Sequence, residues 1–291
     1  MNYRHIYHAG NFADVLKHAV LALMIEYMKQ KDAPFRVIDT HAGVGRYDLL
    51  SVQAGKTNEW QGGIGRILGP DAPQLPPDIA ALLAPYLAIV REFNAGNTLT
   101  AYPGSPELAR RLLRPADALI VNELHPDDHA ELLDLFIRDA QVKVLQLDAW
   151  VAVKALLPPK ERRGLVLIDP PYEETGELAR LARGLAQALK RFATGTFVLW
   201  YPVKDMPPVE DFHASLEGLG IARSLRIELY TRAPDMAERL NGCGLLVINP
   251  PWTLQDQMQT LLPFLSTRLA NGPGGGSLVY RSIPLHPPRP S

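Results

Sequence analysis

Short apolar runs alternate with amphipathic stretches along most of the chain. From residue 117 onward the sequence predicts strands at 118–121, 142–147, 165–168, 196–201, 225–230 and 244–248. Between the first five it predicts helices at 126–138, 150–156, 177–192 and 209–219. Because helical crossovers join parallel strands, we expect an α/β fold with a mostly parallel, Rossmann-like sheet covered by helices on both faces.

The N-terminal part adds one helix and an interruption. Residues 11–31 carry apolar side chains at helical spacing, which predicts an amphipathic helix, and 35–38 form a short strand. Between residues 50 and 104, glycines and prolines interrupt the alternation of strands and helices, and this segment contains one helical stretch at 78–93. We therefore predict a main domain split into 1–50 and 105–291, with a mainly helical subdomain, 51–104, inserted into it.

Bulk composition is that of a folded, water-soluble protein. Of the 291 residues, 47% are hydrophobic and 21% are charged. The single cysteine, Cys243, cannot form an internal disulfide, and the sequence holds no Cys/His cluster at metal-binding spacing. The sequence also lacks an apolar run of about 18 residues and an N-terminal signal pattern. We expect a cytoplasmic monomer with no metal and no membrane contact.

A net charge of −1 excludes a protein that coats nucleic acid through an extended basic surface. Any binding of nucleic acid must therefore use a small cluster of basic side chains. The candidate basic spots are Arg4 with His5 and His8, Arg46, the helix face of Arg110, Arg111 and Arg114, and residues 160–163.

The most informative motif is Asp169-Pro170-Pro171-Tyr172, which follows the apolar strand 165–168. Two prolines fix the backbone and donate no N–H, so the Pro170 carbonyl becomes a rigid acceptor beside the Asp169 carboxylate. Two acceptors can take both hydrogens of an exocyclic amine, and Tyr172 offers a stacking face for a flat base. The other interpretation is a simple turn, since Asp-Pro pairs commonly begin turns.

Three other strands also end in polar groups. Asp39 precedes a Gly-x-Gly turn made by Gly43 and Gly45, Glu123 follows the strand at 118–121, and Asp148 follows the next. Glycine permits a tight turn and a close approach to a ligand, and a carboxylate can accept hydrogen bonds from ribose hydroxyls. The Gly-x-Gly turn alone is equally compatible with a plain loop, because the third glycine of a dinucleotide fingerprint is missing.

Together these motifs resemble the class I S-adenosylmethionine-dependent amino-methyltransferases. Three further segments resemble the RlmJ family, the bacterial adenine-N6 methyltransferases of 23S ribosomal RNA, and the resemblance covers nearly the whole chain. These segments are Tyr3-Arg4-His5 with residues 8–18 (HAGNFADVLKH), residues 40–46 (THAGVGR) and residues 102–106 (YPGSP).

The resemblance implies S-adenosylmethionine as cofactor and ribosomal RNA as substrate. The cofactor site it implies comprises His18, His41, Gly43, Ser105, Glu123, Asp148, Ala149 and Asp169. We expect Asp169, Pro170 and Tyr172 to carry catalysis, and Tyr3, Arg4, Lys17 and Tyr172 to face the substrate.

Two of these assignments have structural alternatives. Lys17 and His18 are neighbours on a helix and so point about 100° apart, which lets both reach one cleft only if it wraps the helix. Ser105 is also a suitable helix N-cap, followed by a proline at the first helical position.

A second copy of the catalytic pattern, Asn249-Pro250-Pro251-Trp252, follows the late strand 244–248. We favour Asp169 because its strand is the fourth in the series, counted from the strand that leads into the Gly-x-Gly turn. The second copy is interpreted as a turn or as a wall of the base pocket.

Three rival functions stay open at this point. A DNA adenine-N6 methyltransferase would use the same Asp169 motif. A nicotinamide-dependent dehydrogenase would explain Gly43 and Glu123 but leaves residues 169–172 without a role. A non-catalytic RNA-binding module fits poorly with the near-neutral charge.

Overall fold

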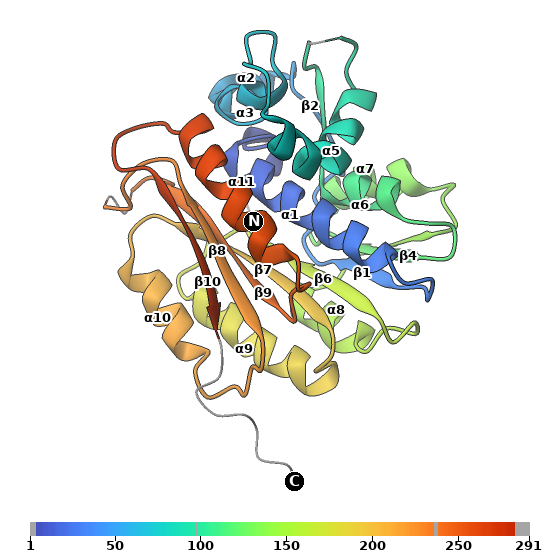
Figure 1. Ribbon diagram of the computed structural model, residues 1–291. Coiled ribbons are helices and arrows are strands. Elements are labelled where there is room, and N and C mark those ends of the chain that lie inside the picture. Colours follow the sequence, from blue (N-terminus) through green and yellow to red (C-terminus); the bar gives the residue numbers. More distant parts are fainter. Residues whose placement is uncertain (1–3, 97, 236–237, 283–291) are drawn as a thin grey trace.

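A single eight-stranded sheet runs through the computed structural model, which describes residues 4–96, 98–235 and 238–282 (Figure 1). In spatial order its strands are β10 (Gly276–Ser282), β8 (Ser224–Tyr230), β9 (Gly242–Ile248), β7 (Thr196–Val203), β6 (Gly164–Ile168), β1 (Arg36–Asp39), β4 (Ala118–Asn122) and β5 (Val142–Leu145). The five strands from β7 to β5 are parallel, and β9, β8 and β10 add antiparallel pairs. The predicted α/β fold with a mostly parallel sheet is confirmed.

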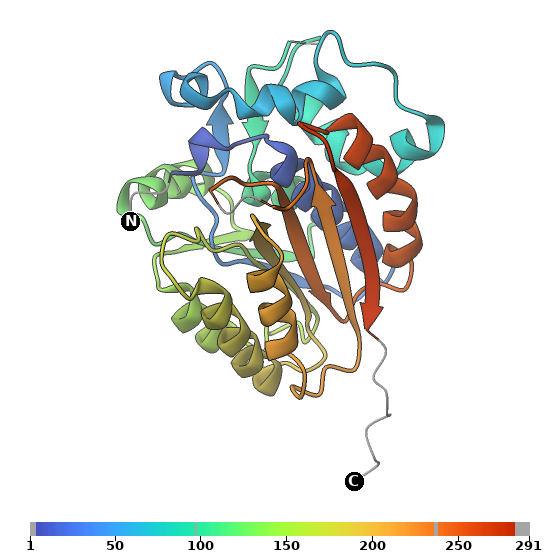
Figure 2. The same cartoon turned by 90° about the vertical axis from the view of Figure 1, so that its left-hand side faces the viewer.

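Helices cover both faces of the sheet (Figures 1 and 2). On one face lie α1 (Phe12–Lys29), α6 (Ser105–Leu112), α7 (Pro126–Phe136) and α11 (Leu254–Arg268), and on the other α8 (Ala149–Leu156), α9 (Glu177–Arg191) and α10 (Pro207–Ser215). Successive residues of a strand point to opposite faces of the sheet, where each face packs against its helices in a separate hydrophobic core. Val37 packs with the first group of helices and Ile38 with the second. The parallel strands are therefore buried on both faces.

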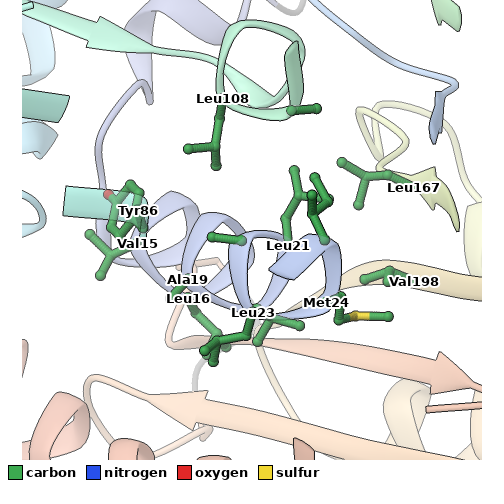
Figure 3. Packing of buried hydrophobic residues seen from close by; sticks show 14 of the residues in the cluster. Val15, Leu16, Ala19, Leu21, Leu23, Met24, Tyr86, Leu108, Leu167 and Val198 are labelled. Atoms are coloured by element: carbon green, nitrogen blue, oxygen red, sulfur yellow. The ribbon is translucent and has the colours of Figure 1, made fainter. Parts of the chain in front are cut away.

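Helix α1 is not the amphipathic helix that its sequence suggested. Every residue from Ala13 to Ile25 is buried, so the helix is enclosed on all sides (Figure 3). Leu167 and Val198 of the sheet pack in the same core as Tyr86 and Leu108 from neighbouring helices. Because no face of α1 meets water over this stretch, its polar side chains Asp14, Lys17 and His18 must find partners inside the protein.

The segment predicted as an insertion begins and ends at a two-stranded antiparallel sheet, β2 (Arg46–Asp48) with β3 (Ala101–Pro103). Between them lie α2 (Val52–Thr57), α3 (Glu59–Gly62), α4 (Gly65–Leu68) and α5 (Pro77–Glu92). Helix α5 packs against α1, and its buried Leu83 and Tyr86 belong to the main core. The division of the chain at 51–104 stays a prediction.

The sequence reasoning missed two C-terminal elements, α11 and β10. Leu261, Leu262 and Leu265 of α11 are buried, and β10 pairs with β8 along its whole length. The stretch 271–276, whose glycine-rich composition favours a flexible loop, joins them, and backbone hydrogen bonds link Asn271 to Thr231 and Pro273 to Ala233, just after β8. Residues 284–291, whose proline-rich composition favours a loosely held tail, lie outside the described residues.

Among the described helices, none combines the length and apolarity needed to cross a bilayer. Within the same residues no group of three or more His, Cys, Asp or Glu side chains is arranged to hold a metal ion.

Candidate active site

The carboxyl ends of the parallel strands meet at one edge of the sheet and form a pocket, here called the strand-end pocket. Asp39 ends β1, Glu123 follows β4, Asp148 caps the start of α8 after β5, and Asp169 follows β6. All eight predicted cofactor residues line this pocket: His18, His41, Gly43, Ser105, Glu123, Asp148, Ala149 and Asp169. The structure thus brings together side chains from positions 18 to 169, as expected where parallel strands end.

The turn after β1 holds Glu123 in place. The Gly43 N–H donates to Oε2 of Glu123 at 2.8 Å, and the His125 N–H donates to Oε1 at 2.8 Å. Gly43 has φ +61°, and a Cβ there would stand 2.2 Å from the Tyr47 hydroxyl, so the turn requires glycine. Each carboxylate oxygen keeps a second lone pair for a ligand hydroxyl. Burial raises the pKa of Glu123.

Ser105 binds Asp39 instead of capping a helix. Its hydroxyl donates to Oδ2 of Asp39 at 2.6 Å, whereas Gly104 occupies the N-cap position of α6. The N-cap interpretation of Ser105 is therefore wrong, because a buried carboxylate competes for the same hydroxyl. Burial raises the pKa of Asp39 to about 6, with the Ser105 bond opposing that rise. Asp39 was recognised as a strand-end acid but was not assigned to the site.

His18 is held by a buried pair of tyrosines. Its Nδ1 lies 2.8 Å from the Tyr102 hydroxyl, which lies 2.8 Å from the Tyr86 hydroxyl. The His18 and Tyr102 rings stack at 5.5 Å. Burial lowers the pKa of His18 to about 3, so the ring is neutral at pH 7. Nε2 is buried and has no hydrogen-bond partner within the described part of the chain.

The neutral state of His18 gives a pH-dependent stability. The unfolded chain takes up a proton near pH 6.5 that the folded chain refuses until about pH 3, so acid favours unfolding between these values. Relative to His18→Gln, the wild-type free energy of unfolding should fall by at most about 1.4 kcal/mol per pH unit between pH 6 and 4. Urea unfolding of both proteins at several pH values measures this. Parallel pH profiles would contradict it.

Lys17 forms ion pairs with two carboxylates, those of Asp14 and Asp169. Its Nζ lies 2.8 Å from Oδ1 of Asp14 and 2.6 Å from Oδ2 of Asp169. Burial opposes the charge on Lys17, but Asp14 and Asp169 outweigh it and hold the pKa of Lys17 well above its usual value. Oδ1 of Asp169 accepts no hydrogen bond from the described residues. One oxygen of Asp169 is therefore fixed and the other is open.

A second pocket, here called the Tyr172 pocket, lies on the other side of Asp169. It is lined by His5, His8, Asn11, Ala13, Asp14, Lys17, Asp169, Pro170, Pro171, Tyr172, Trp200, Pro202, Lys204 and Leu240. Five of these also line the strand-end pocket: His5, Lys17, Asp169, Pro170 and Pro171. The rigid Asp-Pro-Pro segment is therefore a wall common to both pockets.

Tyr172 belongs to the Tyr172 pocket but not to the strand-end pocket. Its hydroxyl donates to the Trp200 carbonyl at 2.6 Å, and the two rings meet edge to face at 5.6 Å. Tyr172 has φ +54°, a left-handed conformation that costs free energy for a residue other than glycine. The prolines and the bond to β7 thus hold the ring in one position beside Asp169.

Two predicted substrate residues are not placed at either pocket. Tyr3 lies outside the described residues. Arg4 turns toward α7, where its guanidinium lies 2.6 Å from Asp128 and near Asp127 and Glu131. The acidic side chains of α7 attract the arginine, and its substrate role stays a prediction.

The second copy of the motif lies at the opposite edge of the sheet. Because β9 runs antiparallel to β7, Ile248 at its end pairs with Phe197 near the start of β7. The Asn249 amide donates to the carbonyls of Ala193 and Gly195, and Trp252 is exposed. The copy is a turn, and the alternative that it walls the base pocket is wrong.

Several pocket residues were not predicted, among them Asp14, His5, Tyr47, Asn122 and Arg180. Asp14 could have been found, since it stands three residues before Lys17 on one helix and so shares its face. Its carboxylate accepts from the Gly10 N–H at 2.9 Å and from His5 Nε2 at 2.9 Å. Burial opposes its ionisation, but nearby His5 and Lys17 hold the pKa of Asp14 well below its usual value.

Comparison with known proteins gives a consistent result. The family described as ribosomal RNA large subunit methyltransferase D, RlmJ, matches residues 32–282. The chain is 45% identical to ribosomal RNA large subunit methyltransferase J of Escherichia coli, over 98% of this chain and 99% of that protein. The Haemophilus influenzae protein of that name is also 45% identical, over 96% and 98%.

A crystal structure of a Legionella pneumophila protein has the same fold. It superposes with a TM-score of 0.84 at 36% identity, covering 95% of this chain and 98% of that one. With the matches over nearly the whole sequence, this result shows that the chain belongs to the RlmJ family.

Proposed function

We propose that this protein transfers a methyl group from S-adenosylmethionine to the N6 amine of an adenine in 23S ribosomal RNA, acting in the cytoplasm as a monomer. The observation that carries the proposal is the shared wall. Asp169, Pro170 and Pro171 line both pockets, so a methyl donor on one side and a base on the other would meet at Asp169. Membership of the RlmJ family supports ribosomal RNA as the substrate.

The strand-end pocket fits the proposed cofactor. Two oxygens of Glu123 can each accept another hydrogen bond, as vicinal ribose hydroxyls require. The unpartnered Nε2 of His18 offers a further polar contact. The pocket also carries more acidic than basic side chains, which suits a cationic sulfonium: Glu123, Asp128, Asp148, Asp169, Glu173, Glu174 and Glu177 against Lys17 and Arg180. When bound, S-adenosylmethionine supplies a methyl carbon that an amine can attack.

The Tyr172 pocket supplies the acceptors for that amine. Lys17 fixes Oδ2 of Asp169 and leaves Oδ1 open, and Pro170 lines the same pocket, so the Pro170 carbonyl is the second acceptor that we propose. Hydrogen bonds from N6 to these two acceptors localise the nitrogen lone pair for attack. As the nitrogen–carbon bond forms, the carbon–sulfur bond would break, its electron pair would stay on the sulfur, and S-adenosylhomocysteine would leave. The nitrogen would lose one proton, which would pass along its hydrogen bond to Asp169.

An adenine must leave its stack to reach this wall, and extrusion costs a few kcal/mol. The cost is least for an unpaired base. We therefore propose that the target adenine lies in a loop or single-stranded segment.

The direct test is methyl incorporation. Ribosomal RNA from a strain that lacks this protein is incubated with the enzyme and tritiated S-adenosylmethionine, and the labelled nucleotide is mapped. One N6-methyladenine in 23S RNA is the expected product. Label in duplex DNA but not RNA would favour the DNA methyltransferase alternative. Binding of a nicotinamide cofactor, but not of S-adenosylmethionine, in a calorimetric titration would favour the dehydrogenase.

A further inference from the structure

The surfaces around Asp169 differ sharply in charge. The strand-end pocket is acidic, and a neighbouring depression beside Tyr172 carries Glu174, Glu177, Asp205 and Asp211 against a single lysine. Phosphates on either surface would meet like charges. An RNA strand whose base enters the Tyr172 pocket must therefore leave in another direction.

A groove of opposite charge opens next to the Tyr172 pocket. Residues of α2, α3 and the turn between them line it on one side, and residues of the β8–β9 connection line it on the other. Asn11 and Leu240 line both this groove and the Tyr172 pocket, so the two adjoin each other. The charged groups of the groove are Arg66, Arg232 and Arg239, with Glu59 as its one acid within the described residues.

Two of these arginines, Arg232 and Arg239, differ from the third in their contacts within the protein. Among the described residues, no ion pair or hydrogen bond engages the guanidinium of Arg232 or Arg239, and Nε of Arg232 is buried without a partner. Arg66 differs, because it donates to the carbonyls of Arg268 and Ala270 at the end of α11. Glu59 is already engaged by His8 and the Asn11 amide.

The helix arginines that the sequence suggested as a nucleic-acid contact are in a different situation. Arg110 pairs with Asp139, Arg111 with Glu92, and Arg114 with Asp117. Their charges are balanced within the protein. Among the described residues beside the active site, the cationic groups left without an ion pair or hydrogen bond are Arg232 and Arg239 in the groove and Lys204 in the Tyr172 pocket itself.

We propose that the groove lined by Arg66, Arg232 and Arg239 binds the sugar-phosphate backbone of the RNA strand on one side of the target adenine. This inference rests on the proposed function, because it takes RNA as the substrate. The arginines contact phosphates and position the strand without reading its sequence. The groove explains how a chain of net charge −1 holds a polyanion: a short basic track adjoins the Tyr172 pocket, and the acidic side chains of the strand-end pocket and of the depression beside Tyr172 repel phosphates from those two surfaces.

The test is the double variant Arg232→Gln/Arg239→Gln, measured against Arg191→Gln. Arg191 lies at the end of α9, is exposed, and its guanidinium forms no ion pair or hydrogen bond within the described residues. The control therefore removes one exposed arginine charge, against two in the double variant, from the other face of the sheet. RNA affinity is measured by fluorescence anisotropy over a range of salt concentrations, with methyl transfer and S-adenosylmethionine binding measured in parallel.

We expect the double variant to raise Kd and KM for the RNA on the order of tenfold at low salt, with kcat and S-adenosylmethionine affinity unchanged. The slope of log Kd against log salt should become shallower by roughly 1.5, since each lost phosphate contact removes about 0.7–0.9. On an RNA cut back to the few nucleotides around the adenine, the difference between variant and wild type should disappear.

Unchanged affinity and salt slope in the double variant would overturn the groove, as would an equal effect of Arg191→Gln. A variant that loses kcat and cofactor binding together would also overturn it, since that result indicates a structural role. These outcomes are distinct from failure of the proposed function, which would appear as a wild-type protein that methylates no RNA. RNA binding would still test the groove in that case.

Discussion

Asp169→Ala should lower the rate of methyl transfer by roughly 10³-fold or more while the protein still binds S-adenosylmethionine with reduced affinity. The side chain supplies the open acceptor, Oδ1, at the wall between the two pockets, and its other oxygen is held by Lys17 at 2.6 Å. Without it the amine has one acceptor left, the Pro170 carbonyl. Single-turnover methyl transfer and calorimetric cofactor binding separate the two effects.

The second copy of the motif provides a matched control. Asn249→Gly removes the corresponding polar side chain and keeps a residue that tolerates the observed φ of +52°. Because Asn249 lies at the opposite edge of the sheet, this variant should transfer methyl groups at close to the wild-type rate. Rapid turnover by Asp169→Ala would break the mechanism, and inactivity of a folded Asn249→Gly protein would refute the assignment of the copy as a turn.

Lys17→Met should lower the free energy of unfolding by roughly 3–5 kcal/mol. The substitution keeps the volume but removes the cation between two carboxylates, and the Lys17 and Asp14 side chains are only 5% and 1% exposed. Asp14 and Asp169 would then remain close together without their shared counter-ion. Urea unfolding at pH 7 measures the loss.

Lys29→Met is the matched control for this change. Lys29 lies on the same helix and pairs with Glu26 three residues earlier, but its side chain is 27% exposed. A pair screened by water contributes about 0.5 kcal/mol or less, so this variant should be nearly as stable as the wild type. Adding Asp14→Asn to Lys17→Met should recover part of the stability, because it removes one unpaired charge. Equal losses for the two lysine variants would show that burial of the Lys17 pair has no energetic consequence.

The strand-end residues were predictable because parallel strands place their carboxyl ends at one edge. Reading Asp39, Glu123, Asp148 and Asp169 from local patterns therefore assembled one side of the site. The second copy at Asn249 shows the limit of such reading. Its local sequence is almost equivalent, and only the reversed direction of β9 removes it from the site.

Local sequence patterns could not predict the Tyr172 pocket, the basic groove or the contact between Lys17 and Asp169. The Lys17–Asp169 bond joins positions 152 residues apart. The Tyr172 pocket needs α1, β7 and the β8–β9 connection in place, and the basic groove combines Arg66 with Arg232 and Arg239. Separations of this length leave no periodic signal, so contacts between distant segments could not be inferred from spacing.

By itself, the sequence determined the alternation of strands and helices and the edge of the sheet where the strand-end pocket lies, and it led us to propose Asp169 and Pro170 as the acceptor pair. These depend on side-chain periodicity and on proline geometry, which act within a few residues. Only the tertiary structure decided that α1 is buried on every side, that Lys17 fixes one oxygen of Asp169, and that a basic groove adjoins the Tyr172 pocket. Those features follow from packing and electrostatics between segments far apart in the chain, where burial forces each charged side chain to find a partner.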